Sequence, residues 1–425
     1  MNSKTKIVVV GGGAGGLELV MRLCHLSKKI PLEITLIDRQ LKHLWKPLLH
    51  EIAAGTFSSY HDEVNYISYA YQKGFTFLQG GLKEINQQKK WINLEPFSEQ
   101  KIFYDILVIA IGSQVNDFNI PGVKDYCLFL DNISTAEAFH QKLINHIINV
   151  QRGREDKIKI SIVGGGATGV ELAAELSYAL SHALKYLNKK ETPSHPLFEI
   201  TLIESGTRLL NMMPERISNN VAKYLLKNNI NILTDTKIVK ATPQGLETTD
   251  KRLIDSSLTV WAAGVKVNNS FITHSLELNA INQFIVRDTL QVSRDTHIFA
   301  FGDCASCPQI DKKGNLGFVP PRAQAAHQQA NFLAKSIRNL ILKKPLPVYH
   351  YKDYGSLISL SHSHTVGVLM GRIVKNFFIE GSLARLTYWL LYKKHLLIVK
   401  GARFIILSCF IDFLLRKKRP EVKLH

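Results

Sequence analysis

Two segments of this sequence repeat one pattern, and the repeat limits the folds that the chain can adopt. "KIVVVGGGAGGLELVMRL" covers residues 6–23, and "KISIVGGGATGVELAAEL" covers 159–176. Each begins with a β-branched run, continues through Gly-x-Gly-x-x-Gly, and ends in apolar residues at helical spacing. One such motif is a weak signal, but two copies in the same strand–turn–helix context are a strong one. We therefore predict an α/β chain with two Rossmann-like dinucleotide-binding domains.

Each of the three glycines in a copy is needed for a different structural reason. They permit a tight turn, let the backbone approach a pyrophosphate, and allow the helix to pack closely on the strand. The N–H groups at the start of the helix then face the anion. These glycines are Gly11, Gly13 and Gly16 in the first copy and Gly164, Gly166 and Gly169 in the second.

Each copy is followed by the phrase "EITLI" and then by an acidic residue, which we expect to bind ribose hydroxyls. Asp38 lies 22 residues after Gly16, and Glu204 lies 35 residues after Gly169, across a longer predicted helix and loop. An acid at this point repels a 2′-phosphate, so the second site is predicted to take NADH rather than NADPH. Arg208, close by in the sequence, weakens that preference.

Three further strand-like segments predict how the two domains are connected. "YDILVIAIGS" (104–113) and "DTHIFAFGDC" (295–304) complete the first domain, and "LTVWAAGV" (258–265) completes the second. The second domain is thus predicted to be inserted into the first. The expected boundaries are 1–115 with 275–345 for the first domain, 116–274 for the inserted domain, and 346–425 for a C-terminal segment with amphipathic helices.

The net charge of +18 requires a partner of opposite charge, and this charge is unevenly distributed. Residues 346–425 hold 13 Lys and Arg but only 4 Asp and Glu, and they also hold the apolar run 404–415. Basic and apolar residues together favour an anionic lipid surface over nucleic acid. We find no signal peptide and no run suited to crossing a bilayer, and five cysteines in such a chain indicate a reducing compartment.

The closing segment predicts helices that lie in a membrane interface. The twelve residues 404–415 are almost wholly apolar and span about 18 Å as a helix, whereas a hydrocarbon core is about 30 Å thick. A narrow polar stripe there, Ser408 and Asp412, leads to the basic run 416–419. We predict contact with an anionic lipid surface through 381–419, and a core or dimerisation helix is the alternative. The earlier part offers Leu383, Leu386, Trp389 and Leu390 on one face, Tyr388 and Tyr392 near Trp389, and Arg385, Lys393 and Lys394 for lipid phosphates.

Three segments, one of them within the second repeat, carry a family resemblance. "HLWKPLLHEIAAG" (43–55), "GGGATGVELAAEL" (164–176) and "RAQAAHQQA" (322–330) are similar to the type II NADH dehydrogenases, single-subunit NADH:quinone oxidoreductases that pump no protons. The resemblance covers nearly the whole chain. It implies non-covalent FAD in the first domain, NADH in the second, and hydride transfer to flavin followed by two-electron reduction of a membrane quinone in a respiratory chain. It also implies an enzyme that lies on the membrane without spanning it and belongs to a family that often forms homodimers. We assume a bacterial source, with the enzyme on the cytoplasmic face of the inner membrane.

The resemblance assigns residues to the FAD site. Asp38 would meet the adenosine ribose, Lys46 and Pro47 the isoalloxazine ring, and Asp303 of "FGD" the ribityl–phosphate region. The full predicted set is Gly11, Gly13, Ala14, Gly15, Gly16, Asp38, Arg39, Lys46, Pro47, Leu82, Ala110, Gly112, Asp303, Ala323 and Gln324.

Three residues are the predicted catalytic group. Glu171 would lie near the nicotinamide and the quinone, although a carboxylate in a first helical turn is also favoured by the helix dipole. Gln324 and Gln328 are four residues apart, so they share a helix face and could bond a quinone carbonyl or the flavin. The predicted NADH set is Gly164, Gly166, Gly169, Glu171, Glu204, Ala263 and Gly264.

Several alternatives stay open. Cys304 and Cys307 form one C-x-x-C, which is weak evidence for zinc or for a redox disulfide, so no metal site is predicted. His362 and His364 are interpreted as structural. A sulfide:quinone oxidoreductase would share the fold but needs a working cysteine pair and no NADH. A redox-sensing protein that binds FAD and NADH with slow turnover would carry the same cofactor motifs. The sequence does not specify the quinone.

Overall fold

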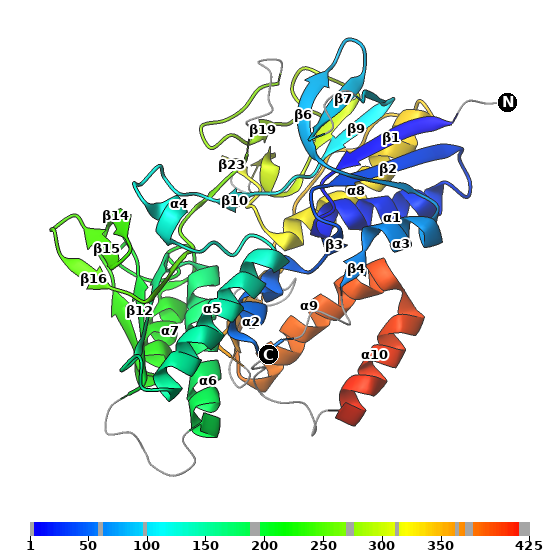
Figure 1. The fold of residues 1–425 in the computed structure, drawn as a ribbon. Helices are drawn as coiled ribbons and strands as arrows, with labels where there is room; N and C mark the ends of the chain where they lie inside the picture. The colour runs from blue at the N-terminus through cyan, green and yellow to red at the C-terminus, as the bar shows by residue number, and fades with distance from the viewer. Residues whose placement is uncertain are drawn as a thin grey trace.

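A parallel sheet forms the centre of the first domain in the computed structural model, which describes residues 4–57, 63–96, 100–187, 196–268, 276–310, 314–361, 365–369 and 377–415. The strand order is β20-β9-β1-β2-β5, and Figure 1 labels β9, β1 and β2 of this sheet. β1 pairs with β2 in register from Thr5 with Leu32 to Val10 with Ile37. The strands are β1 (Thr5–Val10), β2 (Leu32–Asp38), β5 (Thr76–Gln79), β9 (Ile106–Ile109) and β20 (Ile298–Ala300).

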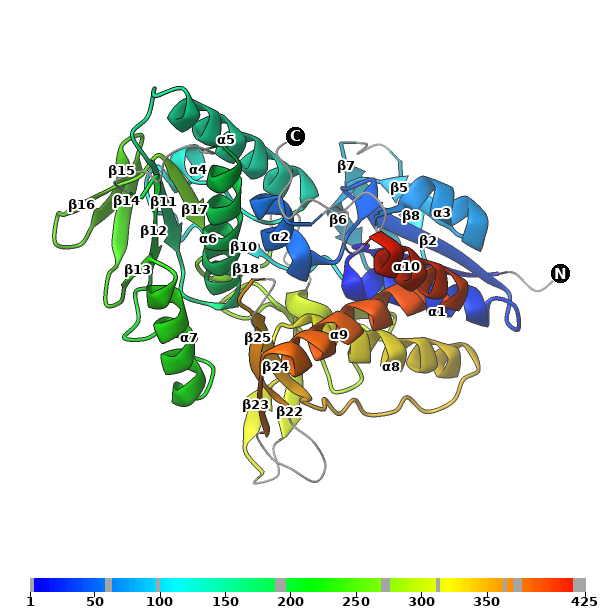
Figure 2. The ribbon, with the colours of Figure 1, turned by 90° about the horizontal axis from the view of Figure 1, so that it is seen from below.

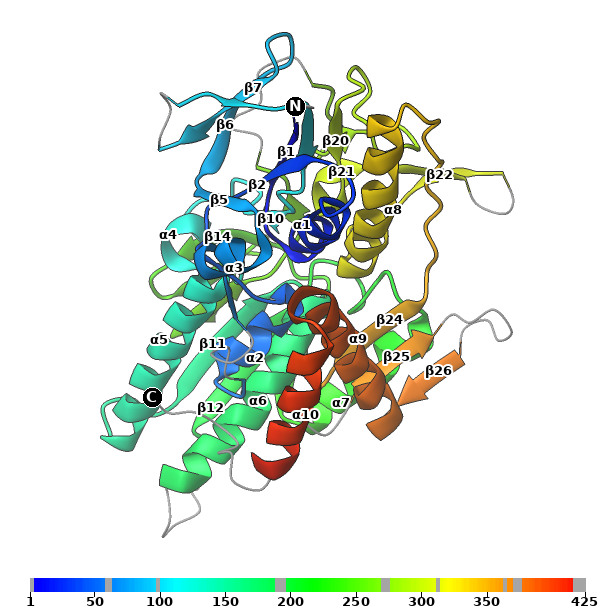
Figure 3. The same cartoon turned by 90° about the vertical axis from the view of Figure 1, so that its right-hand side faces the viewer.

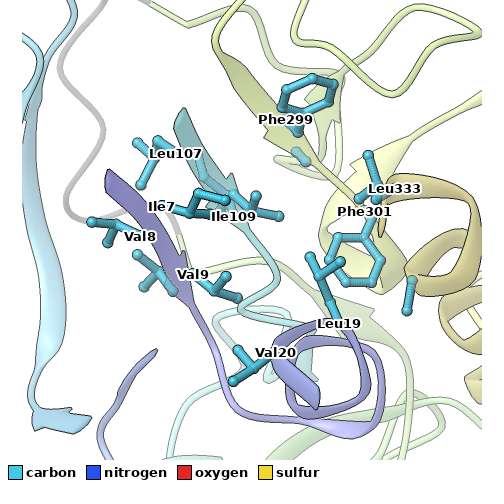
Figure 4. Packing of buried hydrophobic residues seen from close by; sticks show 14 of the residues in the cluster. Ile7, Val8, Val9, Leu19, Val20, Leu107, Ile109, Phe299, Phe301 and Leu333 are labelled. Carbon is cyan, nitrogen blue, oxygen red and sulfur yellow. The ribbon is translucent and has the colours of Figure 1, made fainter. Parts of the chain in front are cut away.

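β-branched residues form this sheet because both of its faces are buried. β9 is apolar and buried throughout, and β1 is apolar and buried from Ile7 to Val10, as expected for central parallel strands covered on both sides. Helices α1 (Ala14–Leu26) and α8 (Ala323–Ile341) pack on each other beside it. Figure 4 shows the contact, with Leu19 of α1 and Leu333 of α8 near Phe301. This core fixes the first glycine loop, which leads from β1 into α1.

A second parallel sheet has the order β13-β12-β11-β17, and β11 and β12 pair in register from Ile158 with Phe198 to Val163 with Ile203. Its strands lie in the sequence between β9 and β20 of the first sheet, so the second domain is inserted as predicted. Together the two sheets confirm the predicted α/β fold class. The elements are β11 (Ile158–Val163), β12 (Phe198–Ile203), β13 (Ile230–Leu233), β17 (Leu258–Trp261), α5 (Ile133–Gln151), α6 (Ala167–Leu187) and α7 (Glu215–Lys227).

The two domains are joined by more than a pair of linkers. β10 (Gln114–Val115) and β18 (Val265–Lys266) pair antiparallel where the chain passes between them. Helix α2 (Leu49–Ala54) comes from the first part of the chain, yet Leu49 and Ile52 lie in the second core with Phe139 of α5 (Figure 2). Residues 49–54 therefore do not pack as part of the first domain. The exact domain limits stay predictions.

Shorter elements connect and flank the sheets. Two three-stranded antiparallel sheets are β6-β7-β8 and β14-β15-β16. These elements are β3 (Lys42–His43), η1 (Lys46–Leu48), β4 (Val64–Asn65), α3 (Tyr66–Lys73), β6 (Gly81–Asn86), β7 (Trp91–Glu95), β8 (Ile102–Phe103), α4 (Val123–Tyr126), β14 (Ile238–Thr242), β15 (Gly245–Thr248), β16 (Leu253–Asp255), β19 (Phe284–Ile285), η3 (Gly302–Cys304), β21 (Ala305–Ser306), β22 (Pro308–Ile310) and β23 (Leu316–Phe318).

The C-terminal segment contains a sheet as well as the predicted helices. β24 (Gly355–Ser359), β25 (Thr365–Leu369) and β26 (Phe377–Glu380) form an antiparallel sheet that contributes Ile358 and Val366 to the second core. Helices α9 (Ser382–Lys400) and α10 (Ala402–Leu415) follow and lie side by side (Figure 3). Among the described residues, every helix falls short of the length and apolarity that crossing a bilayer requires.

Two details of this segment differ from the sequence analysis. Lys393 does not point to solvent: it is 6% exposed, and its Nζ donates to Oγ of Ser408 on α10 over 2.9 Å. Tyr392 is also buried, against Leu48 and Leu396, whereas Trp389 is 39% exposed. The reason is that α10 covers this side of α9. The basic run 416–419, Asp412's side chain, His362 and His364 lie outside what the structure describes.

Candidate active site

A single cavity of about 2040 Å³ runs between the two glycine loops. Its wall includes Gly13 from the first loop and Gly166 from the second, and it continues to Tyr388, Leu391 and Lys394 on α9. A cavity of this size is larger than a typical small-molecule site, which suits two dinucleotides or a dinucleotide with a further substrate. Of the predicted residues, these line it: Gly11, Gly13, Ala14, Gly15, Gly16, Asp38, Arg39, Lys46, Pro47, Leu82, Ala110, Gly112, Gly166, Glu171, Gly264, Asp303, Ala323, Gln324 and Gln328.

The first glycine loop has its backbone fixed from several directions. A Cβ on Gly11, whose φ is +104°, would lie 2.2 Å from the carbonyl oxygen of Ala110, and one on Gly16 would lie 1.8 Å from the oxygen of Gly11. Both positions therefore require glycine. The Gly12 N–H donates to Oδ2 of Asp38 over 2.6 Å. A Cβ on Gly13 would meet nothing within 4 Å, so this position opens onto the cavity.

The second glycine loop repeats this arrangement. Gly164 has φ +114°, and a Cβ on Gly169 would lie 2.0 Å from the oxygen of Gly164. The Gly165 N–H donates to Oε2 of Glu204 over 2.7 Å, as Gly12 does to Asp38. A Cβ on Gly166 would again meet nothing within 4 Å. Each domain thus offers an open cradle between a helix start and a carboxylate, which is the geometry that holds a dinucleotide pyrophosphate.

Four predicted NADH residues are not part of the cavity wall. Gly164 and Gly169 shape the turn, and Glu204 stands behind the loop, held by the N–H of Gly165 and by that of Gly206 over 2.7 Å. Ala263 packs beside the core that contains Trp261. Arg208 is engaged elsewhere, since its guanidinium donates to the carbonyls of Met213 and Asn211. That engagement lowers its capacity to receive a 2′-phosphate.

A chain of polar contacts lies between the first loop and the centre of the cavity. Lys46 Nζ donates to the carbonyl of Ser113 over 2.9 Å, and Ser113 Oγ donates to Oδ2 of Asp303 over 2.8 Å. The turn at Gly302 and Asp303 is held by Gln329, whose Oε1 accepts from the Gly302 N–H, and by Gln283, which donates to the Asp303 carbonyl. The predicted residues Lys46 and Asp303 are therefore brought together. Arg39, by contrast, forms an ion pair with Glu95 at the rim.

Glu171 is one of three carboxyl groups that share a buried space. Burial raises the pKa of Glu171 to about 8, while the Ser359 N–H, which donates to its Oε1 over 2.9 Å, acts in the opposite direction. Burial together with Glu175 raises the pKa of Glu51 to about 8, and burial raises the pKa of Glu175 to about 7. His50 Nδ1 lies 3.8 Å from Oε2 of Glu171. Burial therefore favours the protonated form of the Glu171 carboxyl at the cavity wall.

Gln324 and Gln328 lie along the cavity, and both amides are bonded to backbone groups of residues 352–355, where β24 begins. Gln324 Nε2 donates to the carbonyl of Gly355 over 3.1 Å, and its Oε1 accepts from the Tyr354 N–H over 2.8 Å. Gln328 bonds the carbonyl and the N–H of Lys352. These bonds use one of the two N–H groups of each amide. The helix thus fixes 352–355 and keeps one donor per glutamine for a ligand.

The C-x-x-C cysteines do not have the environment of reactive thiols. Both are fully buried, and burial raises the pKa of each to about 12. A thiolate is the nucleophile and metal ligand, so this environment opposes both roles. Within the described ranges, no group of three or more His, Cys, Asp or Glu side chains could hold a metal ion.

The sequence analysis missed several residues of the site. Glu175 lies four residues after Glu171, so helical spacing could have placed it on the same face. Glu51 follows His50 in "LLHE", but its burial against α6 depends on where α2 packs. Glu18, His43, His327 and His395 also border the cavity, and no local sequence signal joins residues so far apart.

Comparison with known proteins gives consistent matches. Residues 5–330 match the family described as pyridine nucleotide-disulphide oxidoreductase. A type II NADH:quinone oxidoreductase of Haemophilus influenzae is 41% identical over 99% of this chain and 99% of its own, and one of Staphylococcus saprophyticus is 28% identical over 88% and 91%. Among solved structures, NDH2 from Plasmodium falciparum in complex with NADH superposes with a TM-score of 0.83 at 22% identity, covering 99% of this chain and 100% of that chain. The sulfide:quinone oxidoreductase of Aquifex aeolicus gives 0.74 at 19% identity, over 97% and 95%, so the fold alone does not separate these activities.

Proposed function

The chain belongs to the type II NADH:quinone oxidoreductases, within the pyridine nucleotide-disulphide oxidoreductase family, and we propose that it oxidises NADH and reduces a membrane quinone by two electrons without pumping protons. The observation that carries this proposal is the single cavity onto which both glycine loops open and which extends to α9. Two cofactor cradles that share one space can bring a hydride donor and an acceptor into contact.

The flavin that the family implies fits the first cradle, and we propose that it is non-covalent FAD. Gly13 leaves room for a pyrophosphate, and Asp38 lies at the end of β2, where a ribose would be received. Lys46, Pro47 and Asp303 would border the ring and ribityl region, with Arg39, Leu82, Ala110, Gly112 and Ala323 around them. When bound, FAD supplies the hydride acceptor and the two-electron donor for the quinone.

The second cradle would hold NADH through Gly166 and Glu204. The carboxylate of Glu204 repels a 2′-phosphate, and Arg208 is bonded to Met213 and Asn211. We therefore propose a preference for NADH over NADPH. Glu171, Gln324 and Gln328 would act where the cavity continues toward α9: Glu171 holds a proton that a reduced quinone needs, and the glutamines offer N–H donors to a carbonyl.

The decisive experiment uses the purified protein with its bound flavin under anaerobic conditions. Addition of NADH should bleach the flavin absorbance rapidly, NADPH should bleach it at least tenfold more slowly, and a short-chain quinone should restore the colour. Bleaching that no quinone reverses would favour the redox-sensing alternative. Bleaching by sulfide and not by NADH would favour a sulfide:quinone oxidoreductase, which the buried Cys304 and Cys307 oppose.

We also propose that α9 and α10 lie on an anionic lipid surface. Large apolar side chains are more than half exposed on both helices, including Leu383 and Leu390 on α9 and Ile406 and Phe410 on α10. Arg385 and Lys394 are exposed beside them, whereas Lys393 is withdrawn. Sedimentation with vesicles that contain anionic lipid should recover the protein, and vesicles of neutral lipid should recover less of it.

The quaternary and cellular arrangement completes the proposal. The cavity meets α9, so a membrane contact at α9 and α10 would give a lipid-soluble quinone the shortest route. We propose residence on the cytoplasmic face of a bacterial inner membrane, where NADH is present, and a homodimer in solution. Analytical ultracentrifugation in detergent tests the dimer. We also propose that the domain boundaries lie near residues 115, 274 and 345.

A further inference from the structure

A buried network of one carboxyl and two imidazole side chains connects helix α9 to the first glycine loop. Glu18 lies on α1, His43 on β3 and His395 on α9, and each is less than 5% exposed. His43 and His395 are 352 residues apart in the sequence. None of the three has a part in the proposed hydride or quinone chemistry.

The distances form an unbroken chain. Oε1 of Glu18 lies 2.8 Å from Nδ1 of His395, and Nε2 of His395 lies 2.9 Å from Nε2 of His43. Nδ1 of His43 lies 3.0 Å from the carbonyl oxygen of Gly12, the residue before the open position Gly13. The chain therefore ends on the backbone that would hold the flavin pyrophosphate.

The acceptor at the end of the chain fixes where the protons are. The Gly12 carbonyl can only accept, so Nδ1 of His43 carries a hydrogen. His43 is fully buried and neutral, because burial and then His395 lower its pKa to about 3, so its Nε2 is an acceptor. His395 must then donate from Nε2, and the contact between its Nδ1 and Glu18 contains one further proton. If that proton is on Nδ1, the contact is an imidazolium–carboxylate pair; if it is on Glu18, the contact is between a neutral imidazole and a carboxylic acid.

Neighbouring side chains add contacts at both ends of this series of hydrogen bonds, at the glycine loop and at His395 of α9. Tyr66 donates a second hydrogen bond to the Gly12 carbonyl over 2.7 Å. The indole of Trp45 lies on the His395 ring with centroids 4.3 Å apart, next to Lys46. Nδ1 of His327 lies 2.6 Å from the other oxygen of Glu18, and the His327 side chain is partly exposed.

We propose that Glu18, His395 and His43 act as positioning residues that link the docking of α9 to the phosphate-binding loop, so that flavin binding and α9 docking stabilise each other. This inference rests on the proposed flavin site. Coupling between two sites is reciprocal, so the factor by which docked α9 tightens flavin binding equals the factor by which flavin stabilises α9 docking.

The first test needs no variant. Hydrogen exchange is measured on the full chain in detergent, with the flavin bound and after its removal. We expect the amides of 382–400 to exchange about tenfold more slowly in the flavin-bound protein. Equal exchange of this segment in both states, with protection confined to the glycine loop, would overturn the proposal.

The second test is a double-mutant cycle on flavin release, followed by the rise in flavin fluorescence on dilution. Glu18→Gln and His395→Gln should each release flavin about tenfold faster, and the double variant should be no worse than the faster single variant. Glu33→Gln, at an exposed carboxylate outside the cavity, serves as the control and should stay within about threefold of wild type.

Two kinds of result distinguish a failure of the proposed link from a failure of the proposed flavin site. Additive effects of Glu18→Gln and His395→Gln, or unchanged release, would contradict the link while leaving the flavin site in place. A wild-type protein that retains no flavin would instead contradict the proposed function.

Discussion

Glu171 is buried beside two further carboxyl groups, and this burial sets the pH at which its carboxyl loses a proton. Burial raises its pKa to about 8, so the carboxyl is protonated below pH 8 and loses its proton above. We predict that reoxidation of the reduced enzyme by quinone slows as pH rises through 8. Glu171→Gln should be roughly 100-fold slower and independent of pH in this range. Stopped-flow measurement of each half-reaction tests this, because reduction by NADH should keep its own pH dependence.

Glu51 shares that space, so it provides the control. Glu51→Gln should keep the alkaline loss of quinone reduction if Glu171 is the proton donor. If instead the loss disappears with Glu51→Gln and persists with Glu171→Gln, then Glu51 supplies the proton.

Glu51 should also affect stability. Its pKa is about 8 in the folded protein, above the ordinary value of 4.5, so the folded state binds more protons between these values. The stability that the Glu51 proton contributes is therefore fully present below about pH 4.5 and is lost as pH rises through 8. Glu51→Gln should raise the free energy of unfolding at pH 9 by on the order of 2 kcal/mol and change little at pH 5. Thermal unfolding at both values measures this, and an equal change at both would point to packing instead.

At the scale of single elements, the two glycine loops make distinct predictions for neighbouring glycines. Gly13 has φ −59° and open space around it, so Gly13→Ala should fold with wild-type stability and lose flavin affinity. Gly166→Ala should fold, keep flavin, and raise the KM for NADH about tenfold. Gly16→Ala should not fold, since its Cβ would overlap the oxygen of Gly11. Flavin content and circular dichroism separate these outcomes, and flavin loss from Gly166→Ala would contradict the assignment of the two cradles.

These loops were predictable because their signals are local. The glycine spacing and the acid after "EITLI" lie within one strand–turn–helix–strand unit, so the sequence alone places Gly13 near Asp38. The contact between His43 and His395 depends on how α9 docks, and the packing of α2 on α5 depends on the angle between domains. Lys393 was predicted to reach lipid from helical spacing alone, but α10 folds over it and supplies Ser408 as a partner.

At the scale of the whole molecule, the position of the cavity predicts that turnover depends on whether the quinone comes from the membrane or from water. The cavity reaches α9, and α10 continues the exposed apolar surface with Leu407 and Phe410, each 58% exposed. Because these side chains contribute little to the core, replacing both with serine should leave the fold intact. It should weaken attachment to vesicles, since burying one such side chain contributes about 1.5–3 kcal/mol.

We therefore predict that the double variant loses turnover with a membrane-bound quinone but keeps it with a water-soluble one. Turnover of Leu407→Ser/Phe410→Ser with a long-chain quinone in anionic vesicles should fall at least tenfold, by the apolar burial lost at two positions. Turnover with a water-soluble short-chain quinone should stay within twofold. Leu226→Ser on α7, equally exposed at 58% but on the inserted domain, is the matched control and should change neither. A parallel fall with both acceptors would mean that α10 supports the active site itself, because the short-chain quinone does not depend on the membrane to reach the cavity.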